Sequence, residues 1–298
     1  MTIQRGLVSI GLPTYNRAAL LRHSLDSLLA QTYKDFELII SDDGSTDNTQ
    51  QLCEEYSAYD KRVRYIRHPK NIGHVINFEY VVRQARGEYF MWGGDDDLWD
   101  KRFIEKLVAA LEANPRASLA VSSYQRVYSD GEICNTTILE KENDLNNLTQ
   151  GEICRKVFSS RYSVKHFMYG IYRKNFLDSL FVRPKPDGIN WDRVFSGEVA
   201  LSSRVVSVPE LLLFVGQHRM PIKKRYKNQD LGRAYKESFA WSKYLLRLFW
   251  RSFTSKTVPF LWKIKLFSYW SSSVWADRER IFWDAVRALR NLRRETVL

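Results

Sequence analysis

The first 123 residues alternate between short apolar runs and longer amphipathic segments, and this alternation constrains the fold more than any other feature of the chain. The apolar runs have the length of β-strands and lie at residues 7–12, 36–41, 63–67, 89–92 and 118–124. The segments between them carry apolar side chains at helical spacing and lie at residues 18–30, 46–58, 75–84 and 101–114. Strands that alternate with helices of this length indicate an α/β fold, with a mostly parallel sheet flanked by helices on both faces.

Polar loops follow three of these expected strands. Pro13–Arg17 follows the first strand, Asp42–Ser45 the second, and Gly93–Asp97 the fourth. In open α/β sheets ligands bind beyond the carboxyl ends of the strands, so these loops are the candidate ligand site. No GxGxxG or GxxxxGK[ST] motif accompanies them, and neither a dinucleotide fold of the usual kind nor a P-loop is supported.

Three consecutive aspartates, Asp95–Asp97, stand in the last of these loops. Their charges repel one another unless a cation lies among them. Hard divalent ions such as Mg²⁺ and Mn²⁺ prefer oxygen ligands, and Mg²⁺ often uses only one or two carboxylates. The alternative is a solvated acidic turn that caps the helix at residues 101–114. The turn follows an apolar strand, at a sheet end that already holds Asp42 and Asp43, and this placement favours a metal.

Four parts of the sequence, in order along the chain, resemble the inverting, nucleotide-sugar-dependent glycosyltransferases of family two. VSIGLPTYNR at residues 8–17 resembles the family's opening strand and loop, and FELIISDDGSTD at residues 36–47 resembles its nucleotide-binding turn. Asn71-Ile72-Gly73, Asn77 and the ARGEY run at residues 85–89 are similar to a further family pattern, and Asp95–Asp97 supplies the DxD motif. The resemblance covers about the first 125 residues. It implies a Rossmann-like GT-A fold and transfer of a sugar from a nucleoside diphosphate donor.

The resemblance also implies roles for individual residues. Pro13, Tyr15 and Arg17 match the loop that lines the base and phosphates. Asp43, with Asp42 beside it, matches the aspartate that reads the nucleobase. Asp95 and Asp97 match the carboxylates that hold the metal, Mg²⁺ or Mn²⁺, on the diphosphate and contact the donor ribose. Asp96 stands between them as a further carboxylate of the donor site.

An inverting transfer needs a general base that takes the proton from the acceptor hydroxyl. The family usually places this base in an acidic motif before a helix, and the candidates here are Asp187, Asp192 and Glu198 within residues 186–201. Asp192 matches best, because it stands directly before the expected helix at residues 193–201, and Asp187 is second. The alternative is that Asp192 only caps this helix.

Residues 211–218 resemble a strand of the family and the histidine that follows it. In relatives this region often reads aromatic residue, arginine, any residue, histidine. His218 matches the histidine and is a candidate contact for the metal or diphosphate, whereas Gly216 stands in the place of the arginine. The sequence lacks the tryptophan of the QxxRW motif of processive synthases, and no apolar window is long enough for a membrane span. Transfer of a single sugar is therefore expected.

The last 80 residues differ from the rest in charge and composition. Residues 219–298 hold 19 Lys and Arg against 6 Asp and Glu, while residues 1–218 hold 27 against 28. Six of the nine tryptophans also lie in this tail. Basic amphipathic helices with Trp and Phe suit an anionic membrane surface. The alternative is a helical lid packed on the catalytic domain, and the two readings are compatible.

We therefore expect a GT-A domain over residues 1–218, with a donor half at 1–123 and an acceptor half at 124–218, followed by a C-terminal helical extension at 219–298. The acceptor would be a saccharide, free or linked to lipid, in the synthesis of a cell-surface polysaccharide, at the cytoplasmic face of the membrane.

Three isolated cysteines argue against a disulfide scaffold or a cysteine zinc site. The alternatives are a nucleic-acid or membrane-surface binding module and an inactive glycosyltransferase-like scaffold; nucleic acid is not the expected partner.

Overall fold

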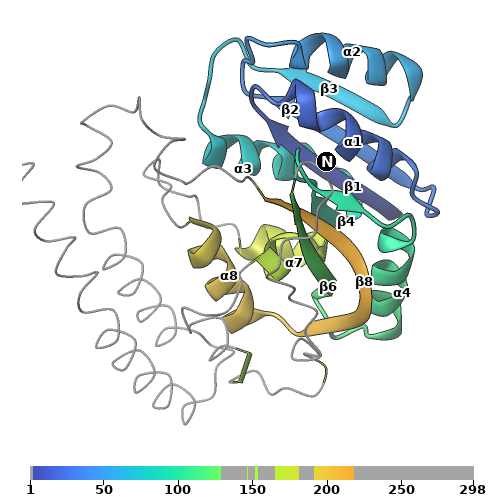
Figure 1. Cartoon of the computed structure of the whole chain (residues 1–298). Coiled ribbons are helices and arrows are strands. Elements are labelled where there is room, and N and C mark those ends of the chain that lie inside the picture. Colours follow the sequence, from blue (N-terminus) through green and yellow to red (C-terminus); the bar gives the residue numbers. More distant parts are fainter. Residues whose placement is uncertain (1–2, 129–145, 147–151, 154–164, 181–190, 218–298) are drawn as a thin grey trace, which may run out of the picture. The chain divides into compact units, whose positions relative to one another are not determined.

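The computed structural model of the whole chain describes residues 3–128, 146, 152–153, 165–180 and 191–217 (Figure 1). The chain divides into two compact units. The first contains Met1–Asn147, His166–Pro186 and Arg204–Arg219, and the second contains Leu148–Lys165, Asp187–Ser203 and Met220–Leu298. The sheet belongs to the first unit, and helix α8 (Trp191–Ser202) belongs to the second.

Within the described residues, eight strands form one sheet in the order β3-β2-β1-β4-β7-β6-β8-β5. The strands are β1 (Gln4–Thr14), β2 (Phe36–Asp42), β3 (Val63–Arg67), β4 (Gly87–Trp92), β5 (Leu98–Trp99), β6 (Leu119–Tyr128), β7 (Ile171–Arg173) and β8 (Val205–Gln217). The four strands from β3 to β4 are all parallel, because β1 pairs in parallel with β2 and β4, and β2 pairs in parallel with β3. The expected strands and their mostly parallel arrangement are confirmed.

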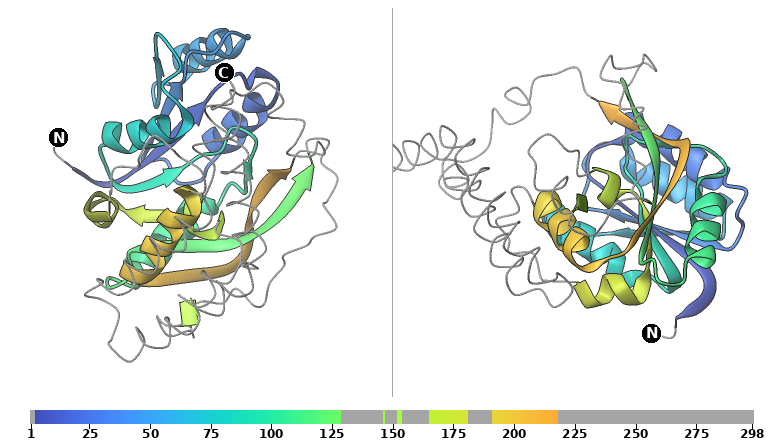
Figure 2. Two further views of the ribbon diagram at one scale, coloured as in Figure 1. Left: turned by 90° about the vertical axis from the view of Figure 1, so that its left-hand side faces the viewer. Right: turned by 90° about the horizontal axis from the view of Figure 1, so that it is seen from below.

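Helices cover both faces of the sheet (Figures 1 and 2). They are α1 (Ala18–Leu29), α2 (Thr49–Tyr59), α3 (His74–Gln84), α4 (Phe103–Ala113), α6 (Lys165–Met168) and α7 (Lys174–Leu180). Residues that alternate along β1 show how helices pack against the two faces of the sheet. Val8, Ile10 and Leu12 are fully buried in one cluster with the apolar faces of α1, α2 and α4. On the other face a Cβ at Gly11 would lie 2.7 Å from Val81 of α3, so the missing side chain lets α3 pack closely.

The sheet departs from simple alternation after β4. The three-residue strand β7 runs antiparallel between β4 and β6, pairing Tyr172 with both Phe90 and Leu119. The expected strand at residues 118–124 is therefore not a neighbour of β4. A strand this short has too few residues to show a period in the sequence.

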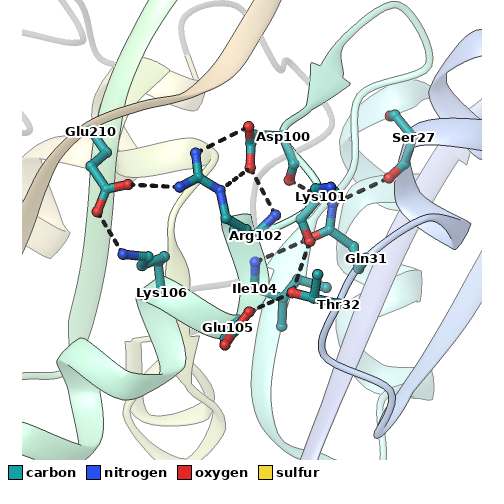
Figure 3. Close-up of polar contacts among 10 residues, drawn as sticks. All are labelled: Ser27, Gln31, Thr32, Asp100, Lys101, Arg102, Ile104, Glu105, Lys106 and Glu210. Carbon is teal, nitrogen blue, oxygen red and sulfur yellow. Dashed lines mark hydrogen bonds and ion pairs between the residues drawn. The ribbon is translucent and has the colours of Figure 1, made fainter.

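Strand β8 is strongly bent, and its bend carries the chain back to the acidic turn (Figure 1). Ser122 of β6 pairs with Val208 and Ser123 pairs with Leu211, so Pro209 and Glu210 form a bulge. Bulges of this kind bend a strand and increase its twist. Glu210 faces α4, where its carboxylate lies 2.9 Å from Lys106 Nζ and 3.5 Å from Arg102 Nη1 (Figure 3).

The ARGEY run lies at the edge of the sheet opposite the polar loops, where β4 begins. The amides of Arg86 and Gly87 donate to Ser9 Oγ of β1, at 3.1 and 2.8 Å. Ser9 Oγ in turn donates to Glu37 Oε1 of β2 at 2.7 Å. A Cβ at Gly87 would lie 2.4 Å from the carbonyl oxygen of Leu7. This part of the family-like pattern therefore joins three strands and contributes to the scaffold.

Asp187, His218 and the basic tail at residues 219–298 lie outside the described residues. The expectations attached to them are taken up below as proposals. Among the residues that are described, no helix has the length and hydropathy to cross a membrane.

Candidate active site

Three polar loops meet at the carboxyl edge of the parallel strands, as the strand order predicts. Thr14, at the end of β1, is in register with Asp42, at the end of β2. The Asp43 amide donates to the Thr14 carbonyl oxygen at 2.9 Å, and the Gly93 amide donates to the Gly11 carbonyl oxygen at 2.9 Å. The loops after β1, β2 and β4 are therefore fixed to one another by main-chain bonds.

The loop after β1 is held to the loop after β2 by reciprocal bonds. Asn16 has φ of 54°, a left-handed conformation that asparagine tolerates better than most residues. Its amide donates to Ser45 Oγ at 2.9 Å, and its Oδ1 accepts from the Thr46 amide at 2.8 Å. Between the buried Pro13 and these bonds, the ring of Tyr15 is 44% exposed. The loop thus presents an aromatic ring to solvent on a rigid backbone.

Asp42 is fully buried and its carboxylate is used within the turn. Oδ1 accepts from the Ser45 amide at 2.8 Å, and Oδ2 accepts from the Tyr65 hydroxyl at 2.8 Å. Burial and the bond to Asp42 hold the pKa of Tyr65 well above its usual value, which keeps the hydroxyl a donor. Arg67 Nε lies 3.7 Å from the same Oδ2. Asp42 therefore organises the turn from inside.

Asp43 is also buried, and it orders the loop at the start of α3. Its Oδ1 accepts from the Ile72 amide at 2.6 Å and its Oδ2 from the Gly73 amide at 3.0 Å. The Asn-Ile-Gly pattern is thus brought to Asp43, although 29 residues separate them in the sequence. Asn77 of α3 adds a bond to β2, because its side-chain Nδ2 donates to the Ser41 carbonyl oxygen at 2.8 Å.

Asp95 lies beside the loop after β1. Its Oδ2 accepts from Thr14 Oγ1 at 3.1 Å and lies 3.7 Å from Arg17 Nε. Burial, together with the nearby charge of Asp96, raises the pKa of Asp95 to about 6, although Arg17 and Thr14 oppose the shift. The raised pKa means that the protein without a bound cation disfavours the ionised carboxylate.

Asp97 is 1% exposed and is positioned by residues from two elements, β8 and α1. Its Oδ1 accepts from the Gly216 amide of β8 at 2.8 Å. Its carbonyl oxygen accepts from Ser24 Oγ of α1 at 2.7 Å. A Cβ at Gly94 would lie 2.2 Å from Asp97 Oδ2, and a Cβ at Gly216 would lie 2.2 Å from the Asp96 carbonyl oxygen. The acidic turn therefore packs between two glycines that leave no room for side chains.

This donor set fits a hard divalent cation. The groups at the turn are carboxylate and hydroxyl oxygens, which Mg²⁺ and Mn²⁺ prefer. Within the described part of the chain, no three His, Cys, Asp or Glu side chains form a complete metal cage. Such an incomplete set suits an ion that takes its remaining ligands from the phosphates of a substrate.

Asp95→Asn is expected to stabilise the cation-free protein at neutral pH. The pKa of Asp95 is about 6 when folded against 3.8 when unfolded, so the folded state binds more protons between these values. The free energy of unfolding of the wild type therefore falls as pH rises through this window, whereas asparagine does not titrate. Two pKa units correspond to about 3 kcal/mol at most. Urea unfolding in EDTA should show a gain of about 2–3 kcal/mol at pH 7.5 that vanishes near pH 4.

The control for this prediction is Asp60→Asn. The guanidinium of Arg62 holds the pKa of Asp60 below its usual value, so the removal of this charge should cost stability at pH 7.5. If Asp95→Asn also lost stability at pH 7.5, as Asp60→Asn should, the raised pKa of Asp95 would be wrong.

Ser24→Ala is expected to destabilise the protein by about 1–3 kcal/mol, because it removes the donor of a buried hydrogen bond to the acidic turn. Ser57 of α2 provides the comparison, since its hydroxyl also bonds to a main-chain carbonyl oxygen, of Glu54 at 3.2 Å, but in exposed surroundings. Ser57→Ala should change stability by less than about 0.5 kcal/mol. Equal effects of the two substitutions in chemical denaturation would contradict the role of Ser24.

Three supporting residues were not candidates from the sequence. Ser24 and Ser27 lie on α1, and Gln31 follows the end of this helix. Ser24 bonds to Asp97 of the acidic turn, whereas Ser27 and Gln31 bond to the segment after it. Ser27 Oγ accepts from the Trp99 amide at 3.3 Å, and the buried Gln31 bonds to the Asp100 carbonyl oxygen and the Ile104 amide (Figure 3). A stripe of small polar side chains on an otherwise apolar helix face was the available signal.

Of the expected catalytic residues, the structure describes Asp192 and Glu198. Asp192 lies in the first turn of α8, where its carbonyl oxygen accepts from Ser196 Oγ at 2.7 Å, and Glu198 is 7% exposed. The expected helix thus begins beside Asp192. Both residues belong to the second unit, whereas the acidic turn belongs to the first. Their part in catalysis stays a prediction.

Comparison with known proteins decides the family. Residues 9–181, more than half of the chain, match the family described as Glycosyl transferase family 2. The chain belongs to glycosyl transferase family 2. The resemblance in its first 125 residues is thereby confirmed, and the polar loops described above lie within the matched region.

Several relatives that are similar in sequence carry the name glycosyltransferase. The chain is 28% identical to an uncharacterized glycosyltransferase of Haemophilus influenzae, over 75% of this chain and 69% of that protein. It is 32% identical to glycosyltransferase GlyG of Streptococcus pneumoniae, over 42% of each protein. It is 39% identical to a glycosyltransferase of Rickettsia typhi, over 35% of this chain and 32% of that protein. The chain thus spans less than half the length of the last two.

Solved structures confirm the GT-A fold. A structure of S. aureus TarS residues 1–349 in complex with UDP-GlcNAc matches with a TM-score of 0.60 at 19% identity, over 96% of this chain and 88% of that one. The mannosyltransferase PcManGT of Pyrobaculum calidifontis, in complex with GDP-Man and Mn²⁺, matches with a TM-score of 0.59 at 16% identity, over 98% and 75%. At these low sequence identities the similarity supports the fold alone.

Proposed function

We propose that the protein is a metal-dependent, inverting glycosyltransferase that moves one sugar from a nucleoside diphosphate sugar to a saccharide acceptor. The observation that carries this proposal is the placement of Asp97. Its carboxylate is packed between Gly94 and Gly216, in the same turn as Asp95, at the sheet edge where α/β proteins bind ligands. A solvated acidic turn would not need this packing.

The donor occupies the three polar loops. The nucleoside lies between the exposed ring of Tyr15 and the turn that contains Asp42 and Asp43, with Pro13 beneath it, and the diphosphate lies near Arg17. The buried bonds of Asp42 and Asp43 keep this turn rigid before the donor binds. The complexes of TarS with UDP-GlcNAc and of PcManGT with GDP-Man support the class of donor.

Asp95 and Asp97 are the carboxylates that would hold Mg²⁺ or Mn²⁺, with Asp96 beside them. His218 is the further ligand that we propose, since it follows two residues after Gly216, whose amide bonds to Asp97. When bound, the ion would neutralise the diphosphate as it leaves. The Mn²⁺ in the PcManGT complex supports this choice of cofactor.

Asp192 is the proposed general base, and Asp187 is the second candidate. The base would accept the proton of the acceptor hydroxyl as that oxygen attacks the anomeric carbon from the face opposite the diphosphate. One displacement of this kind inverts the anomeric centre. Acceptor and donor then leave as glycoside and nucleoside diphosphate, without a covalent intermediate on the protein.

The acceptor that we propose is a growing surface saccharide, carried on a lipid at the cytoplasmic face of the membrane. The basic, tryptophan-rich tail at residues 219–298 supports this location by its composition. The full-length protein should sediment with vesicles that contain 30% anionic lipid and remain in solution with neutral vesicles. Binding that ignores both lipid charge and salt would contradict the membrane role.

A screen of nucleotide sugars tests the proposed function. One or a few donors should raise the melting temperature and be slowly hydrolysed in the presence of Mn²⁺ or Mg²⁺, and EDTA should abolish both effects. The control ligands are the nucleoside monophosphates, which lack the diphosphate that the metal needs. Failure of every nucleotide sugar to bind with either ion present would overturn the proposal and favour an inactive scaffold.

A further inference from the structure

Arg17 is paired with a carboxylate that the proposed function assigns to the metal. We propose that Arg17 holds the place of the cation at Asp95 in the metal-free protein and transfers to the donor diphosphate when the metal binds. Metal and nucleotide would then bind cooperatively, because both favour the position in which the Arg17 side chain has left Asp95 and lies at the diphosphate. This inference rests on the proposed function and adds a coupling device to it.

The geometry at Asp95 suits an ion pair with Arg17 that a metal ion can replace. Arg17 Nε lies 3.7 Å from Asp95 Oδ2, close enough for an ion pair and too far for a hydrogen bond. The same oxygen accepts from Thr14 Oγ1 at 3.1 Å, so Asp95 keeps a hydrogen bond when the guanidinium leaves. The contact between Arg17 and Asp95 is therefore a charge interaction without a hydrogen bond.

Arg17 combines a fixed backbone with a movable head. Its amide donates to Thr49 Oγ1 at 3.1 Å, and its carbonyl oxygen accepts from the Leu20 and Leu21 amides at 3.0 Å at the start of α1. The side chain is 35% exposed. Since an arginine side chain has four rotatable bonds, the guanidinium can adopt another position without a change at the start of the helix.

The charges at the site drive the exchange. Three consecutive carboxylates need a positive partner, and Arg17 supplies one charge next to Asp95. A divalent ion at Asp95 would repel the guanidinium at this distance and attract the diphosphate. A guanidinium binds phosphate oxygens through two parallel N–H donors, which Asp95 does not receive from it in the metal-free protein. The guanidinium that the metal displaces from Asp95 would therefore bind the diphosphate of the nucleotide.

Arg17→Met tests the exchange, with Arg22→Met as the matched control. Arg22, in α1, also pairs with a carboxylate, Glu55 at 3.6 Å, but both side chains of this pair are more than half exposed. Binding of Mn²⁺ alone is followed at pH 8 by the electron paramagnetic resonance signal of the free ion. Binding of UDP, or of the nucleotide found in the screen, is then measured by calorimetry at saturating Mn²⁺.

The expected effects of Arg17→Met have opposite signs. Mn²⁺ alone should bind about tenfold tighter, because a competing charge within a few ångströms is gone. The nucleotide should bind about tenfold weaker at saturating Mn²⁺, because its phosphate contact is lost. A variant that was merely damaged would weaken both. Arg22→Met should behave as the wild type in both titrations.

The two proposals fail in different ways. If the wild type binds Mn²⁺ with nucleotide but Arg17→Met binds Mn²⁺ alone no better than the wild type, the exchange is wrong and the transferase site stands. If nucleotide affinity is unchanged in Arg17→Met, the transfer to the diphosphate is also wrong. If no form binds Mn²⁺, with or without nucleotide, both proposals are overturned.

Discussion

Gly94→Ala should reduce the transfer rate at least about a hundredfold while leaving the protein folded. The new methyl group would lie 2.2 Å from Asp97 Oδ2 and 2.8 Å from its Cγ, so the carboxylate has to move. Asp97 cannot follow freely, because the Gly216 amide and Ser24 Oγ hold it from two sides. Displacement of a metal ligand by about an ångström is enough for a loss of this size. Gly94 does not have a positive φ, so alanine adds no backbone strain.

The adjacent Gly93 provides the matched control. A Cβ there would meet the end of the Leu28 side chain at 3.3 Å and those of Ile10 and Leu12 at 3.5 and 3.6 Å, which are apolar groups that can adjust. Initial rates at increasing Mn²⁺ should show Gly93→Ala close to the wild type and Gly94→Ala with a strongly raised requirement for metal. Normal activity of Gly94→Ala would show that Asp97 is not a metal ligand.

Asp192→Asn should lower kcat by about 10²–10⁴-fold, with little change in nucleotide affinity. Asparagine keeps the size of the side chain but cannot accept the proton of the acceptor hydroxyl. The competing interpretation, a helix cap, predicts a different result. A carboxylate in the first turn of α8 stabilises the helix by about 0.3–1 kcal/mol, and its loss would lower stability without lowering kcat.

Asp187→Asn separates the two candidates for the base. If Asp187 is the base, this variant loses activity and Asp192→Asn keeps it. The pH dependence of kcat gives an independent readout, since the base must be ionised and its removal abolishes the acidic limb of the profile. Full activity of both variants would refute Asp187 and Asp192 as the base.

The parallel half of the fold was predictable because each of its elements carries its own pattern. The run FELIIS predicts a strand that β2 extends by one residue to Asp42, and the leucines of α1 predict a helix that ends one residue earlier than expected. The rest depends on long-range pairing. Strand β7 pairs through Tyr172 with both β4 and β6, and strand β8 has a bulge at Pro209 and Glu210. Neither has a local period.

The carboxylates of the candidate site could be identified from the sequence, whereas the residues that position them could not. Consecutive aspartates after an apolar strand indicate a cation, because their charges need one. Their positioning comes from Ser24, which reaches across 73 residues, and from Gly216, which reaches across 119. A serine within a helix and a glycine within a strand look ordinary in the sequence. The sequence also did not show that the carboxylates of Asp42 and Asp43 bond to the turn and to the start of α3.

The most direct test of a metal-dependent donor site at the acidic turn is calorimetric titration of UDP, or of the nucleotide identified by the screen, into three samples. These are the wild type with Mn²⁺, the wild type with EDTA, and Asp97→Asn with Mn²⁺. We expect tight binding in the first sample and at least about a tenfold loss of affinity in the other two. Equal affinity in all three samples would refute a metal-dependent donor site at the acidic turn.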